Sequence, residues 1–86
     1  MTREEQRSAL REALETWAQR GYCLLVNKIG DVERLVIHGD HDREWFVEIR
    51  MSWDDKPGGD IRVTGTIDDG GIGAFFPTTD SVLVSP

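Results

Sequence analysis

The segment REWFVEIRMSW (residues 43–53) alternates polar and apolar side chains along almost its whole length. The even positions are polar except for Phe46. The odd positions from 45 onward are all apolar: Trp45, Val47, Ile49, Met51 and Trp53. Successive side chains of a strand point to opposite faces of a sheet, so this period of two predicts a strand with one buried face. A chain with such a strand needs a fold in which another element covers that face.

A second alternating segment, DIRVTGTID (residues 60–68), places Ile61, Val63 and Ile67 on one side. The residues between the two segments, DDKPGGD (54–60), combine aspartates with Pro57 and two glycines. Asp, Pro and Gly favour turns for backbone reasons. We therefore expect an antiparallel hairpin, in which this acidic loop needs no ligand to explain its composition.

The first twenty residues have a different period. Leu10, Ala13, Leu14 and Trp17 recur at the spacing of one helix face. Residues 2–5 (TREE) fit a capping box at the start, and the glycine at position 21 favours an end there. These signals predict a helix over residues 3–20, and its narrow apolar stripe indicates that it lies on a sheet.

Shorter apolar runs supply the remaining strands. YCLLVNKI and VERLVIH flank Gly30-Asp31 and predict another hairpin, while GAFFP and SVLVS predict short terminal strands. The expected fold class is α+β, with one N-terminal helix packed on an antiparallel meander sheet of four to six strands. A chain of 86 residues is expected to form a single domain (1–86), with its β region over 22–85 and its three tryptophans in the core.

Sixteen acidic and ten basic residues give a net charge of −6. Residues 1–20 are neutral, so the whole imbalance lies in the rest of the chain. Negative charge disfavours nucleic acid and anionic membranes, both of which attract basic surfaces. A basic protein is the electrostatically favoured partner.

The chain has one cysteine, Cys23, so an intramolecular disulfide is excluded. The charged N-terminal segment does not resemble a secretion signal, and no apolar run approaches the length of a membrane span. These features predict a cytoplasmic location. A Cys23–His38 pair across neighbouring strands would join a thiol to a base, but no third group completes a catalytic set. Cys23 is therefore expected to be a small apolar residue and His38 a partly buried one, with no catalytic residue and no cofactor.

Two further acidic segments, GDHD (39–42) and DDGG (68–71), are expected to emerge at the same edge of the sheet. Carboxylates with an imidazole suit Ca²⁺, Mn²⁺ or Zn²⁺, but the spacing of an EF-hand is missing and aspartate is common in turns. The glycines of DDGGIGAF also lack the helix that a phosphate-binding loop requires. The weak metal-binding candidates are Asp40, His41, Asp42, Asp68 and Asp69.

Aromatic residues suggest a different kind of site. Phe75 and Phe76 are adjacent and cannot both point inward from an extended segment, and Phe46 breaks the polar face of its strand. An exposed aromatic beside acidic loops is typical of a protein-binding surface, unless the C-terminal strand SVLV covers it. The partner-binding candidates are Phe46, Phe75, Phe76, Asp40, Asp42, Asp68 and Asp69.

These observations favour a small acidic, non-enzymatic protein-binding module that engages a basic partner, for example as an inhibitor or an immunity-type protein. One alternative is a structural homodimer formed through sheet edges, whose unpaired amides favour pairing with another copy. The other alternative is a small metal- or ligand-binding domain that uses the acidic segments at 40–42 and 68–69.

Overall fold

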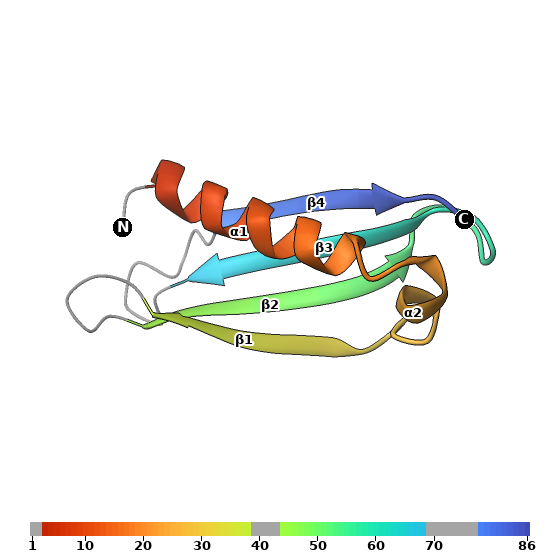
Figure 1. Cartoon of the computed structure of the whole chain (residues 1–86), viewed down its shortest axis with the longest axis horizontal. Helices are drawn as coiled ribbons and strands as arrows, with labels where there is room; N and C mark the ends of the chain where they lie inside the picture. The colour runs from red at the N-terminus through yellow and green to blue at the C-terminus, as the bar shows by residue number, and fades with distance from the viewer. Residues whose placement is uncertain (1–2, 39–43, 69–77) are drawn as a thin grey trace.

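The computed structural model describes residues 3–38, 44–68 and 78–86, and it contains one antiparallel sheet with a long helix packed on it (Figure 1). The elements in chain order are α1 (Arg3–Ala18), α2 (Tyr22–Val26), β1 (Val32–His38), β2 (Glu44–Trp53), β3 (Ile61–Asp68) and β4 (Thr78–Val84). The strands lie in the order β1-β2-β3-β4, which is a meander. The predicted α+β class is therefore confirmed, with a sheet of four strands.

The hairpin of β2 and β3 forms the centre of the sheet. Met51 lies opposite Val63 and Trp53 opposite Ile61, as expected from the two alternating segments. The Asp54 amide donates to the Asp60 carbonyl at 3.0 Å, and Gly58 has a φ of +88°. The loop over residues 54–60 is thus closed by backbone hydrogen bonds and by a glycine conformation that other residues rarely adopt.

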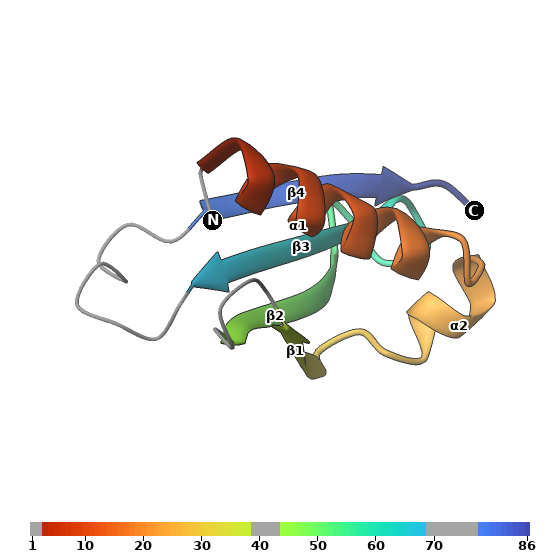
Figure 2. The same cartoon turned by 60° about the vertical axis from the view of Figure 1, so that its left-hand side comes forward.

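Helix α1 lies over β3 and β4 and presents its apolar stripe to the sheet (Figure 2). Leu10 and Leu14 are completely buried, and Trp17 is nearly so. The helix ends at Ala18, two residues before the predicted end, and Gly21 follows with a φ of +97°. The predicted cap at Thr2 lies outside the described residues.

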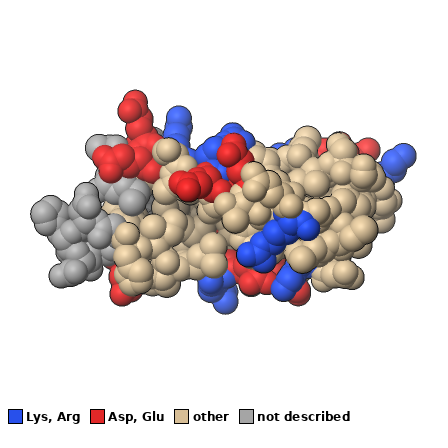
Figure 3. Space-filling view, in the orientation of Figure 1, with Lys and Arg blue, Asp and Glu red and all other residues tan. Residues whose placement is uncertain are grey.

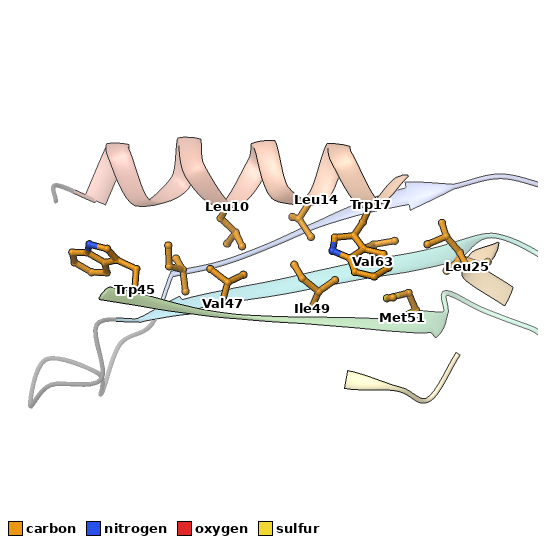
Figure 4. Packing of buried hydrophobic residues seen from close by; sticks show 11 residues of the cluster. Leu10, Leu14, Trp17, Leu25, Trp45, Val47, Ile49, Met51 and Val63 are labelled. Carbon is orange, nitrogen blue, oxygen red and sulfur yellow. The ribbon is translucent and has the colours of Figure 1, made fainter. Parts of the chain in front are cut away.

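The core fills the space between α1 and the sheet (Figure 4). Its buried apolar side chains are Leu10, Leu14, Trp17, Leu25, Trp45, Val47, Ile49, Met51, Ile61, Val63 and Ile67. Trp53, the third tryptophan, is only half-buried and packs at the rim, with its ring centroid 6.5 Å from that of Tyr22. Two tryptophans are therefore in the core as predicted, and the third borders it.

The prediction of a strand within residues 22–29 is wrong. Tyr22–Val26 forms α2, which lies at the end of the sheet, and the turn after it leads into β1. The residues that contact the core there, Tyr22, Leu25, Val26 and Ile29, are spaced as on a helix. As a consequence, β1 pairs with β2 and not with residues 22–29.

The C-terminal strand is confirmed, because β4 includes the SVLV segment and pairs with β3 along its length. The segment GAFFP lies within residues 69–77, outside the described part of the chain. The two outer strands of the sheet are therefore β1 on one side and β4 on the other.

Candidate interaction surface

The face of the sheet opposite α1, called the open face below, is covered by no element of the described residues. The residues on this face are assigned from the alternation of side chains along each strand and from the register between strands. β1 and β2 contribute Val32, Arg34, Val36, His38, Glu44, Phe46, Glu48, Arg50 and Ser52. β3 and β4 contribute Arg62, Thr64, Thr66, Thr79, Ser81 and Leu83.

Val36 and Phe46 form an apolar pair on the open face. They are direct cross-strand partners, and their exposed fractions are 49% and 45%. β4 lies beside β3 in the plane of the sheet, so it does not cover Phe46. Of the two alternatives for Phe46, exposure or coverage by the C-terminal strand, the structure therefore shows exposure, whereas Phe75 and Phe76 lie outside the described residues.

Charged side chains surround this pair and are mostly neutralised locally. The Glu48 carboxylate lies 3.8 Å from Arg34 Nε and 3.5 Å from Arg50 Nη2. Farther along, Arg62 donates through Nε to Asp54 at 2.9 Å and through Nη1 to Ser81 at 3.0 Å. The described part of the open face is therefore mixed in charge.

The acidic excess of the chain lies in other places. Asp54, Asp55 and Asp60 belong to the β2–β3 loop, and Asp40, Asp42 and Asp69 fall outside the described residues. On the face viewed in Figure 3, acidic and basic side chains are interspersed. Any electrostatic preference of the open face for a basic partner must therefore come from its surroundings.

The metal-binding candidates are placed only in part. Phe46 lies opposite Asp68, so the start of β2 and the end of β3 meet at one end of the sheet. The segments that contain Asp40, His41, Asp42 and Asp69 lie outside the described residues. Among the residues that the structure does describe, no group of three or more His, Cys, Asp or Glu side chains is arranged to hold a metal ion.

Cys23 and His38 are not brought together. Cys23 belongs to α2 at one end of the sheet, and His38 ends β1 at the other end, about 20 Å along a seven-residue strand. Both side chains are exposed, so the expectation of a partly buried His38 is wrong, and Cys23, expected to be a small apolar residue, lies at the surface. The pair therefore provides no nucleophile and base.

A shallow groove runs between α1 and β1 on the other face of the sheet. Its volume is about 380 Å³, and its apolar walls include Ala13 and Trp17 of α1 and Leu35 and Ile37 of β1. One helix about 10 Å wide covers roughly two strands spaced about 4.8 Å apart, so α1 leaves β1 partly bare. Leu35 is 37% exposed for this reason.

Comparisons with protein-family models, with curated proteins and with solved structures found no match for this chain. Neither helix in the described parts of the chain has the length and apolar character needed to cross a membrane. Among the partner-binding candidates predicted from the sequence, Phe46 is the one whose exposure the described residues establish, and it was found because it interrupts the polar face of its strand. Val36 was missed, because its exposure depends on which strand it pairs with and which face that strand leaves open.

Proposed function

We propose that this chain is a non-enzymatic protein-binding module that contacts its partner through the open face, with Phe46 and Val36 at the centre of the contact. The observation that carries the proposal is this cross-strand apolar pair, which is about half exposed on both strands. Aromatic side chains in the middle of a surface are common binding hot spots. An inhibitor or an immunity-type protein is one form that such a module takes.

The surroundings of the pair support a protein partner. Glu48, Arg34 and Arg50 form a charged border on one side of Val36 and Phe46. An apolar centre with a polar border that remains in water is the usual anatomy of a protein–protein interface. The net charge of −6 argues against a phosphate backbone as the ligand.

The partner is proposed to be basic. The open face itself is mixed in charge, so attraction to a basic protein would act over a longer range, from the net charge of the whole chain. Such steering raises the rate of association more than it strengthens the final complex. We therefore expect the association rate to fall as ionic strength rises, with a smaller change in the dissociation rate.

The test compares three tagged proteins in affinity capture from a lysate of the source cells, with quantitative mass spectrometry: wild type, Phe46→Ser and Leu83→Ser. Leu83 is a matched control because it is 50% exposed on the same face, near the other end of the sheet and about 20 Å from Phe46. Phe46→Ser is expected to deplete the captured partner by roughly tenfold or more, because central hot spots contribute about 2 kcal/mol. Leu83→Ser is expected to retain it.

The purified partner then serves for kinetics at low and high salt. A partner with a basic surface and a salt-dependent association rate supports the proposal. Equal capture by wild type and Phe46→Ser would contradict the role of the open face, and a salt-independent association rate would contradict the basic partner. Both variants should first be shown to unfold at the denaturant concentration of wild type, since both side chains are exposed.

A further inference from the structure

The two outer edges of the sheet differ in how they are held. β4 is tied to α1, because Thr78 Oγ1 donates to Gln6 at 2.9 Å and Arg11 pairs with Asp80 at 2.9 Å. β1 has no comparable tie to α1 in the described residues, and its outer edge faces away from the rest of the sheet (Figure 1). An outer strand presents unpaired amides and carbonyls that favour pairing with another chain.

Apolar exposure is concentrated at this same edge. Leu35 and Val36 of β1 and Phe46 of β2 are three of the five large apolar side chains exposed in the described residues. Charged side chains usually protect an outer strand, and within β1 (Val32–His38) the carboxylate and the guanidinium each already have an ion-pair partner. Glu33 is paired with Lys28 at 3.0 Å, and Arg34 lies 3.8 Å from Glu48.

We propose that the outer edge of β1 pairs antiparallel with β1 of a second copy, so that two sheets join into one of eight strands. The two-fold axis lies between the two strands at the level of Val36, so Val36 lies opposite Val36 of the second copy. In this register Leu35 lies opposite Ile37 of the second copy, and Arg34 lies opposite His38 of the second copy. Both contacts occur twice, as a two-fold axis requires.

Side-chain chemistry selects this register. Residues that lie opposite each other must share a face of the sheet. The axis must therefore be level with one residue of β1, and it cannot be level with the midpoint between two successive residues. An axis through Glu33 or Arg34 would place like charges opposite each other, which destabilises a pair. An axis through Leu35 would place Glu33 opposite Ile37, whereas an axis through Ile37 would pair a shorter length of β1.

Rows across the joined sheet are complementary in the proposed register. On the open face, one row reads Phe46, Val36, Val36 and Phe46, the last two from the second copy. On the other face, a row reads Val47, Leu35, Ile37 and Trp45, again with the last two from the second copy, and it is entirely apolar. In the next open-face row, Arg34 lies between its own Glu48 and the second copy's His38, which borders Glu44.

The inference is independent of the proposed function, although it would double the apolar centre of the open face. In this register residues 34–38 of each β1 lie opposite β1 of the second copy, and this contact is shorter than that of a typical stable dimer, which buries about 800 Å² on each partner. We therefore expect dissociation constants on the order of micromolar. Sedimentation of the wild-type protein should shift from monomer to dimer as its concentration rises through this range.

Cysteine cross-linking tests the register. In a Cys23→Ser background, Val36→Cys places two thiols opposite each other at the axis, within the range that a disulfide can bridge after small adjustments. Diamide, a two-electron oxidant, is expected to convert this variant to covalent dimer far faster than Leu83→Cys, which is equally exposed and reports random collision. Arg34→Cys in the same background should also cross-link slowly, because it faces position 38.

A wild-type protein that remains monomeric at millimolar concentration would overturn the proposal. A dimer in which Arg34→Cys cross-links faster than Val36→Cys would overturn the register. The two proposals fail separately: a strict monomer that loses its partner in Phe46→Ser leaves the proposed function standing. If the protein dimerises but its Phe46→Ser variant captures the same proteins as wild type, the dimer proposal stands and the proposed function is contradicted.

Discussion

Gly65 determines how closely α1 approaches the sheet. It lies on the face of β3 that carries Val63 and Ile67, at the point where α1 crosses. A Cβ atom at this position would lie 2.7 Å from Leu10 Cδ1 and 3.0 Å from Leu14 Cδ2. Both leucines are completely buried, so their ends have little space to move. The absence of a side chain therefore lets the helix and strand pack directly.

Gly65→Val is expected to destabilise the fold by about 1–3 kcal/mol, because overpacking forces neighbours from their positions. The matched control is Thr64→Val, the next position on the same strand, which points to the open face and should change stability by less than about 0.5 kcal/mol. Urea unfolding followed by tryptophan fluorescence measures both. Equal stability of the two variants would show that α1 can shift at little cost.

At the scale of elements, the sequence predicts those helices and strands whose periodic pattern continues over many residues. The alternation over 43–53 and 61–67 predicts β2, β3 and their loop, and the stripe from Leu10 to Trp17 predicts α1. The five-residue run YCLLV is too short for its period to separate strand from helix. The useful signal was the spacing of Tyr22, Leu25, Val26 and Ile29, which becomes visible only when the run is read together with the residues after it.

α2 is attached to the β2–β3 loop by one side chain. The Tyr22 hydroxyl donates to the Gly59 carbonyl at 2.7 Å, and the Tyr22 ring lies against Trp53. Tyr22→Phe keeps the ring and removes only the hydroxyl, so a loss of about 1 kcal/mol is expected from the missing hydrogen bond. Thermal unfolding of this variant and of Cys23→Ser, an exposed neighbour expected to be neutral, makes the comparison. A Tyr22→Phe variant as stable as wild type would mean that water replaces this contact without loss.

For the whole molecule, the available surfaces follow from the fact that one long helix covers only part of a four-stranded sheet. α1 covers β3 and β4, so no element of the described residues covers the open face, the edge of β1 or the groove beside it (Figure 2). Phe46 is predictable from the sequence because it breaks a local pattern. The edge position of β1 is not, because it follows from the order of strands and from the helical conformation of residues 22–26.

The same asymmetry predicts how the molecule opens. β2 and β3 each have a neighbour on both sides and carry buried side chains such as Val47, Ile49 and Val63. β1 has one neighbour, and its Leu35 and Val36 are exposed. Local opening occurs first where few apolar contacts and few paired amides hold an element. We therefore expect β1 to open well below the free energy of global unfolding.

Native-state hydrogen exchange of dilute protein measures this order. The slowest amides of β2 and β3 should exchange slower than the slowest amides of β1 by roughly an order of magnitude or more. β4 should fall between them, because Gln6 and Arg11 of α1 hold it through Thr78 and Asp80. Equal protection of β1 and β2 would mean that the sheet opens only as one unit. It would also mean that α1 stabilises the far edge through the core, although it does not cover that edge.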